Sequence, residues 1–258
     1  MTFKAIPLLL LPTAFVLVLM ACQGASPIAT ETSPLAPTAT PPTPSPTPTP
    51  VNPEALLALS GERMAALNTF AFLLSHEGGG TDLGGNLSLV IEEAEGAVTW
   101  PKDLKLDVVG QTGNVVIKLS LISTGDATYV TNPFTGQWQE MEVDANPLGF
   151  FDPWSGIAAI MASVEQPAYR GVTAMQKGAQ AHLLHGRLPA PALASLLGAA
   201  AGEAVLDVEL WLEVETLYLL RVVVQGRLTT AEDAGIVRTI ILSDFDKPVD
   251  IEPPFLGR

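Results

Sequence analysis

The sequence has a single cysteine, Cys22, among its 258 residues. One cysteine excludes an intramolecular disulfide and a metal site built from several thiolates. Aromatic residues make up only 6% of the chain, so a folded interior must be mostly aliphatic. Lysine and arginine number 13 against 27 aspartates and glutamates, and this shortage of positive charge disfavours nucleic acid as a partner, because phosphate binding needs clustered basic side chains. The fold must therefore be stabilised by an aliphatic core without cross-links.

The sequence around the cysteine predicts a lipid anchor. Cys22 ends the tetrapeptide Leu19–Cys22, small Ala21 stands directly before it, and the preceding apolar run starts after Lys4. These features are typical of a signal peptide, and the run is too short and too rich in proline to span a membrane, which takes about 20 residues. An uncleaved transmembrane segment is the alternative. We predict that residues 1–21 are a lipoprotein signal peptide and that Cys22 carries acyl chains such as palmitate, which hold the protein at the membrane in an extracytoplasmic compartment.

A proline-rich segment follows the predicted anchor. Residues 25–53 contain ten of the 22 prolines and only one charged residue, Glu31. Such a composition favours an extended polyproline conformation and cannot bury enough apolar surface to fold. We therefore expect residues 22–53 to form an acylated stalk, and residues 54–258 to form one globular domain, which is long enough for a single core.

Hydrophobic periodicity predicts the elements of this domain. Asn52, Pro53 and Glu54 are typical of a helix start, and apolar residues continue at helical spacing to about residue 67. After this helix, apolar residues alternate with polar ones, as in an antiparallel sheet with one face in water. The predicted strands contain Leu87–Ile91, Leu104–Val108, Val115–Leu121, Val208–Val214 and Tyr218–Val224.

Two apolar segments without this alternation predict further helices. One starts at the capping pair Asp152–Pro153 and continues to residue 165. The other spans residues 190–202 and has almost no charge on any face, so it must be covered on all sides or lie against something apolar. The segments together indicate a large antiparallel sheet with a few helices.

Catalytic and metal-binding patterns are weak. His182 and His185 are three residues apart, but the neighbouring sequence predicts a strand, on which this spacing directs the two rings to opposite faces. No serine lies in a G-x-S-x-G motif, and the acidic end Asp244–Asp250 lacks the spacing of a calcium loop. We therefore expect no enzymatic activity, no cofactor and no metal site.

The order of strands and turns resembles a known family. The relevant stretches are the hairpin of residues 127–141, the helix after Pro153, the tandem strands at 205–228 and the ending Ile240–Val249. Over roughly residues 54–254 they resemble the LppX/LprAFG family of bacterial lipoproteins, which share a half-open β-barrel related to the LolA and LolB carriers. The resemblance implies an α+β fold in which helices close the concave side of a large curved antiparallel sheet. It also implies that lipid or glycolipid acyl chains bind in an apolar cavity there, for carriage or presentation across the cell envelope.

A cavity of this kind needs facing aliphatic side chains. We expect it between the sheet and the helices at 153–165 and 190–202, with small residues such as Ala159 leaving volume for a ligand that binds by burial alone. The residues expected to line it are Leu104, Leu106, Ile117, Leu119, Ile157, Ile160, Met161, Leu193, Leu196, Leu197, Leu210 and Leu212. The alternative is a fully packed core, in a non-catalytic module whose sheet docks another envelope protein.

Replacement of the cysteine, Cys22→Ser, should move the protein from the membrane to the soluble fraction, because the segment before it is too short to anchor the chain without acylation. Fractionation of cells expressing each form measures the change. Continued retention of the variant in the membrane, released only by detergent, would contradict the predicted anchor.

Overall fold

The computed structural model describes residues 51–82, 89–100, 103–125, 127–141, 156–193, 202–230 and 232–256. Cys22, the predicted signal peptide and nearly all of the predicted stalk lie outside the described residues. The helical elements are α1 (Pro53–Ala65), α2 (Ile157–Ala162) and the short 3₁₀ helices η1 (Gln176–Gly178) and η2 (Ala190–Leu193). The strands are β1 (Thr69–Glu77), β2 (Thr81–Asp82), β3 (Leu89–Thr99), β4 (Asp103–Thr112), β5 (Val115–Thr124), β6 (Ala127–Thr131), β7 (Trp138–Met141), β8 (Glu165–Ala174), β9 (Gln180–Pro189), β10 (Val205–Glu213), β11 (Leu219–Gln225) and β12 (Val237–Ser243).

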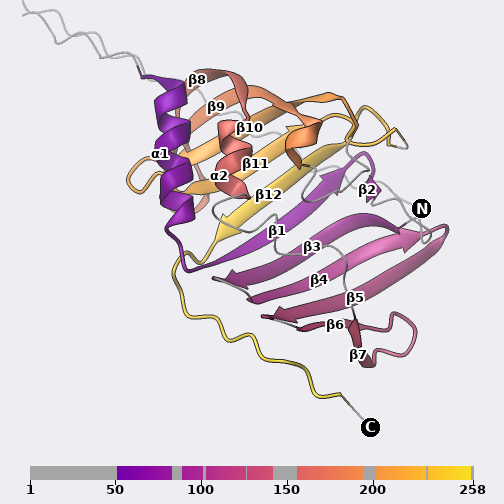
Figure 1. The fold of residues 1–258 in the computed structure, drawn as a ribbon. Helices are drawn as coiled ribbons and strands as arrows, with labels where there is room; N and C mark the ends of the chain where they lie inside the picture. Colours follow the sequence, from indigo (N-terminus) through magenta and orange to yellow (C-terminus); the bar gives the residue numbers. More distant parts are fainter. Residues whose placement is uncertain are drawn as a thin grey trace, which may run out of the picture. The chain divides into compact units, whose positions relative to one another are not determined.

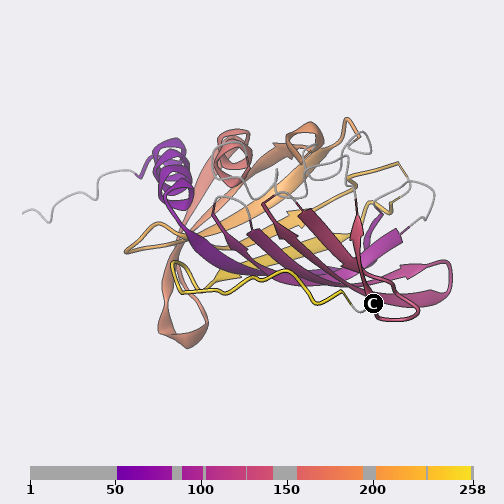
Figure 2. The same cartoon turned by 60° about the horizontal axis from the view of Figure 1, so that its bottom comes forward.

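All the strands belong to one antiparallel sheet. Their order is β7-β6-β5-β4-β3-β1-β12-β11-β10-β9-β8, and β2 pairs with β3 beside this path. The sheet does not close, so β7 and β8 form its two edges. The α1, α2 and η2 helices lie on one face of it, as Figures 1 and 2 show. This arrangement confirms the predicted fold class, a large antiparallel sheet with a few helices.

Two chain meanders meet at the centre of the sheet. The β3–β7 strands follow one another in space as in sequence, and so do the β8–β12 strands. The β1 strand joins them, because it pairs with β3 on one side and with β12 on the other. The C-terminal segment reinforces this junction: the Asp246 carboxylate accepts a hydrogen bond of 2.8 Å from the Asn68 amide, and the Thr69 hydroxyl donates to the Lys247 carbonyl at 2.7 Å.

The predicted alternation of apolar and polar residues is clearest in β10. Leu206, Val208, Leu210 and Leu212 are buried, while the residues between them are exposed or half-buried. The pairing of β10 with β11 shifts register between Trp211 and Leu212. As a result Leu212 pairs with Leu219, which is also buried. One side of β10 therefore belongs to the core, which we call the inner face of the sheet, and the other side faces solvent.

The first helix is confirmed, with its end at Ala65 rather than at residue 67. The Asn52 side chain accepts a hydrogen bond of 2.9 Å from the Ala55 amide and so caps its start, directly before Pro53. Ser60 is fully buried, and its hydroxyl donates to the Leu217 carbonyl at 2.6 Å, in the turn between β10 and β11. This bond fixes α1 over the ends of these strands.

Both of the other predicted helices differ from expectation. The helix expected at 153–165 is described only from Gly156, and it ends at Ala162 because β8 begins at Glu165. The segment expected to be helical over 190–202 starts as η2, and residues 194–201 lie outside the described residues. In the described part of the chain, no helix combines the length and the apolar character that crossing a membrane requires.

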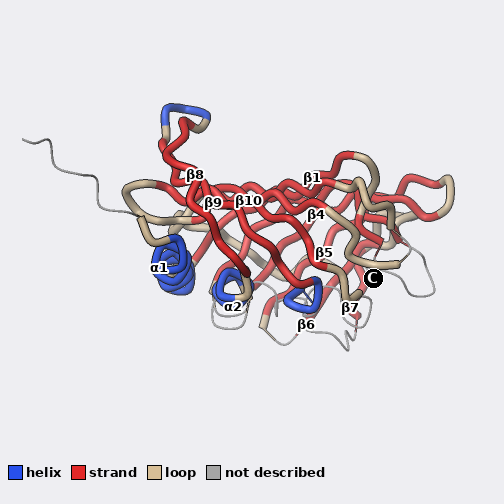
Figure 3. The backbone as a smooth tube through the Cα atoms, turned by 90° about the horizontal axis from the view of Figure 1, so that it is seen from above, coloured by secondary structure: helices blue, strands red, loops and turns tan. Residues whose placement is uncertain are grey.

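The edge strand β8 is irregular. Its pairing with β9 shifts register between Glu165 and Ala168 and again between Tyr169 and Gly171. Pro167 lies in the first irregularity, directly after Gln166, which has a positive φ of 51°. These features interrupt the row of backbone groups that an edge strand presents. Figure 3 shows that the η1 end of the β8–β9 hairpin projects away from the rest of the sheet.

The hydrogen bond of Ser60 gives a test of how α1 is held. Ser60→Ala should lower the free energy of unfolding by about 1 kcal/mol, because the buried donor is lost and the Leu217 carbonyl loses its partner. Ser163→Ala is the matched control, since this hydroxyl bonds only to the Ala159 carbonyl of its own helix, and it should change the stability by less than about 0.5 kcal/mol. Equal effects in urea denaturation would show that the bond does not fix the helix.

Candidate functional site

Most of the residues predicted to line a cavity lie together on the inner face. Eight of them belong to the hydrophobic core or pack against it: Leu104, Leu106, Ile157, Ile160, Met161, Leu193, Leu210 and Leu212. Several are completely enclosed by protein, with exposures of 1% for Leu104, 2% for Met161 and 0% for Leu212. The prediction that these strands and helices face one another is consistent with this cluster, whereas a cavity between them stays a prediction.

Ile117 and Leu119 lie on the same face but outside the core cluster. Leu119 is opposite Val108, and Ile117 is opposite Gly110, in the pairing of β4 with β5. Opposed residues of antiparallel strands share a face, so both side chains point to the inner side. They are half-buried. The remaining two predicted residues, Leu196 and Leu197, lie outside the described residues.

The inner face therefore has two parts with different packing. Under α1, α2 and η2, the residues of β9 to β12 are buried against the helices (Figures 1 and 2). On β4 to β6, beside the buried Leu104 and Val108, several aliphatic side chains are only half-buried. We call these residues the open apolar row: Leu106, Ile117, Leu119, Leu121 and Val130. Leu121 joins the row across three strands, because it pairs with Leu106 on β4 and with Val130 on β6.

The expected orientation of Ala159 is wrong. On α2 the buried residues are Ile157 and Met161, while Ala159 is exposed. Instead Ala158 contacts the first helix, where a Cβ placed on Gly61 would lie 3.6 Å from the Ala158 Cβ. The small residues of α2 and α1 thus allow the two helices to approach closely, and at Ala159 they leave no space on the inner face.

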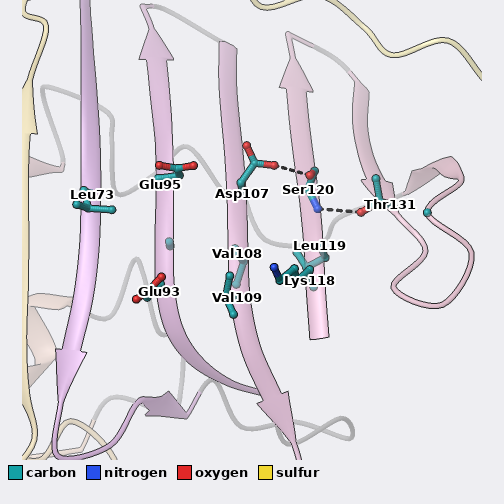
Figure 4. Close-up of a pocket in the computed structure, with 12 residues that line it drawn as sticks. Leu73, Glu93, Glu95, Asp107, Val108, Val109, Lys118, Leu119, Ser120 and Thr131 are labelled. Carbon is teal, nitrogen blue, oxygen red and sulfur yellow. Dashed lines mark hydrogen bonds between the residues drawn. The ribbon is translucent and has the colours of Figure 1, made fainter. Parts of the chain in front are cut away.

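The opposite, solvent-exposed face carries a pocket of mixed polar and apolar lining that sequence reasoning did not identify. Its volume is about 450 Å³, and Figure 4 shows its lining, which includes Leu73, Glu93, Glu95, Asp107, Lys118 and Ser120. The Ser120 hydroxyl donates a hydrogen bond to the Asp107 carboxylate, and the Ser120 amide donates to the Thr131 hydroxyl at 2.8 Å. Glu95 lies directly opposite Asp107 in the sheet, and with Glu93 these residues bring three carboxylates to the pocket, beside Lys118. Its lining therefore combines charged groups with apolar side chains such as Leu73 and Val109.

The two histidines considered for metal binding lie on β9. This confirms that their segment is a strand. The Tyr169 hydroxyl and the Nδ1 of His182 are 3.1 Å apart, whereas His185 pairs with Glu209 and Ala168. Within the described ranges, no three histidine, cysteine, aspartate or glutamate residues are grouped as metal ligands.

A second polar feature, the rim network, consists of His76, Thr81, Glu232 and Arg238. Arg238 is 4% exposed and Glu232 is 5% exposed, and an Arg238 Nη2 to Glu232 Oε2 distance of 2.5 Å makes them a buried ion pair. The Arg238 Nε donates to the Thr81 hydroxyl at 2.8 Å, and this oxygen is also 2.8 Å from the His76 Nε2. A cavity of about 500 Å³ opens beside His76. The signal for this network was an arginine at an apolar-face position of a strand, Arg238 in Val237–Ile240.

The fold and the inner face define a class: an open antiparallel sheet that packs helices over one half of its apolar face. The chain belongs to the LppX_LprAFG lipoprotein family, whose model matches residues 52–251. Among solved structures, LprF from Mycobacterium bovis is 17% identical with a TM-score of 0.62, and the match covers 78% of this chain and 96% of that chain. The lipoprotein LppX from Mycobacterium tuberculosis is also 17% identical, with a TM-score of 0.53 and coverage of 77% and 98%. No curated protein matches the sequence.

The difference in packing across the inner face is testable. Leu212→Ala should lower the free energy of unfolding by about 2–5 kcal/mol, because it opens a cavity in a filled core. Leu119→Ala removes the same atoms from a half-buried position and should cost less than about 1 kcal/mol. Denaturation of both variants in urea measures the two values. Similar losses would show that the β4–β6 part of the face is packed as tightly as the core.

Proposed function

We propose that this protein is an extracytoplasmic lipoprotein, anchored through Cys22, that binds acyl chains of a lipid or glycolipid on the inner face and carries or presents them without catalysis. The open apolar row is the observation that carries this proposal. Its five aliphatic residues come from three neighbouring strands and share one face with a core that is otherwise filled. The acyl chain would lie along β4 to β6.

The energetics of such a site require no polar contact. Burial of each methylene group stabilises an acyl chain by about 0.8 kcal/mol, so a chain of ordinary length outweighs the loss of its translational and conformational freedom. The row offers branched aliphatic side chains such as Leu106, Leu119 and Val130, without a charge among them. A surface of this kind selects for apolar chains and discriminates weakly between their head groups.

The family supports this proposal at the level of the fold and of the lipid anchor. The matched range, residues 52–251, includes all the strands and helices that form the inner face. Anchoring through acylated Cys22 would place the row outside the cytoplasm, where lipids of the envelope are its natural ligands. The length of the predicted stalk would then limit the distance between the domain and the membrane.

A non-catalytic docking module is the second candidate. Leu73 and Ile241 are 41% and 43% exposed, and they lie opposite each other on the solvent face of β1 and β12. Arg221 pairs with Ile241, and its guanidinium stacks at 4.8 Å over the Trp211 ring on the neighbouring strand. Adjacent apolar and cationic groups on a sheet are suited to contact another envelope protein.

Organic extraction distinguishes the two candidates. The Cys22→Ser form, purified without a membrane anchor, should release lipid into chloroform and methanol in roughly equimolar amount, as measured by mass spectrometry. A matched pair of variants on β5 then locates the site. Leu119→Trp should reduce the extracted lipid to a small fraction, because the ring fills the space over the open apolar row, while Val116→Trp, on the solvent face of the same strand, should leave the yield unchanged.

Both variants should remain folded, since neither position is in the filled core, and circular dichroism during heating checks this. If the purified protein releases no lipid, the carrier function is wrong and the docking module replaces it. If both variants lose lipid equally, the ligand lies elsewhere than on the inner face of β5.

A further inference from the structure

The rim network contains a histidine, His76, whose neutral tautomer is fixed by its neighbours. The His76 Nδ1 lies 2.6 Å from the Glu92 backbone carbonyl, which can only accept a hydrogen bond, so this nitrogen carries the proton. The Thr81 hydroxyl accepts a hydrogen bond from the Arg238 Nε, and its own hydrogen is then free to be donated to the His76 Nε2. When His76 is neutral, its Nδ1–H, the Thr81 hydroxyl and the Arg238 Nε each donate to an acceptor of their own. This match of donors to acceptors is lost when His76 is protonated.

Protonation of His76 disturbs this arrangement in two ways. An Nε2 that carries a hydrogen must donate to the Thr81 oxygen, so the hydroxyl hydrogen loses its acceptor. The new positive charge also lies near the Arg238 guanidinium, whose charge is already paired with Glu232. Burial lowers the pKa of His76 from its ordinary value of 6.5, and Arg238 lowers it further, against the opposing effects of the Glu92 carbonyl and of the Glu232 and Glu92 carboxylates.

The charged groups around His76 come from each neighbouring element. Arg238 faces it from β12, directly opposite in the strand pairing, and Glu232 faces it from the connection between β11 and β12. Glu92 lies on β3, where its carboxylate accepts a hydrogen bond from the side-chain amide of Gln111 on β4. The Asp82 amide of β2 donates to Glu232 Oε1 at 3.2 Å. The cavity of about 500 Å³ beside His76 gives protons access to the ring.

The same network holds the connection between β11 and β12 in place. Glu232 Oε2 accepts hydrogen bonds from Arg238 and, at 2.8 Å, from the Leu228 amide, while Arg238 Nη1 donates to the Gly226 carbonyl at 2.9 Å. The Leu228 carbonyl in turn accepts from the Gly202 amide at 2.8 Å. Leu228 is 2% exposed and belongs to the core. Loss of these bonds would uncover one end of the apolar core.

We propose that the rim network is a pH-sensitive switch, in which neutral His76 holds the β11–β12 connection against β2, and protonated His76 releases it. The lowered pKa of His76 determines how the stability of the closed arrangement changes with pH. A histidine with a lowered pKa in the folded state favours the folded, closed arrangement above pH 6.5, and this contribution is lost as the pH falls through 6.5 and below. Acidification thus opens one end of the core locally.

Amide hydrogen exchange of the full chain tests this proposal. Peptides that contain Leu228 should lose protection by about threefold or more between about pH 7.5 and about pH 5.5, after correction for the intrinsic rates of exchange. His76→Gln should remove this dependence, because glutamine does not titrate. His185→Gln is the matched control, since His185 lies on β9 away from the network, and it should keep the dependence of the unmodified protein. The readout does not involve lipid, so it is independent of the proposed function.

A second measurement keeps the test decisive if His76→Gln does not fold. The imidazole resonances of the folded protein are titrated by NMR and assigned with His182→Gln and His185→Gln, which leave the rim network intact. His76 should titrate below 6.5. A value at or above 6.5, or protection at Leu228 that does not change with pH, would overturn the switch.

Discussion

The structure depends on the antiparallel pairing of β1 with β12. These strands stand near the two ends of the domain in sequence, and their pairing joins the β3–β7 meander to the β8–β12 meander in one sheet. Asp246 and Lys247 bind the residues just before and at the start of β1, and His76 and Arg238 are opposite each other at its end. Loop closure over such a distance is entropically costly, so the meanders are expected to form before this junction does.

The parts of the fold that sequence could predict are those with a strong local signal. Asn52 and Pro53 mark the start of α1, and strict alternation marks β4, β5 and β10. Alternation also predicts which residues share a face with Leu119, because a strand has only two faces, and in the structure Leu119 is opposite Val108. It failed for Ala159, since a helix of six residues offers too few turns to fix which side is buried.

In other elements the local sequence pattern disfavours the secondary structure that forms. The β1 strand contains the continuous apolar stretch Phe70–Leu74, which carries no period of two. The β8 strand contains Pro167 and Gly171, residues that usually end strands, and only its edge position tolerates them. Arg238 stands in phase with the buried Leu242 of its strand, which hints at its burial, but its partners Glu232 and Thr81 are seen only in the structure. Such partners come from distant segments, so no local pattern reveals them.

The irregular edge strand β8 has a mechanical consequence. Among the described residues the strand order ends at β7 and β8, and the bulges and Pro167 on β8 make that edge a poor template for a further strand. At the β8 edge the sheet can therefore remain unclosed without pairing with a strand of another molecule. A closed barrel has a girth set by its strand number and stagger, whereas an unclosed sheet can bend more or less tightly while every interstrand bond is kept. The inner face can therefore change its curvature without loss of strand pairing, which would let the lipid-binding face that we propose accommodate acyl chains of different bulk.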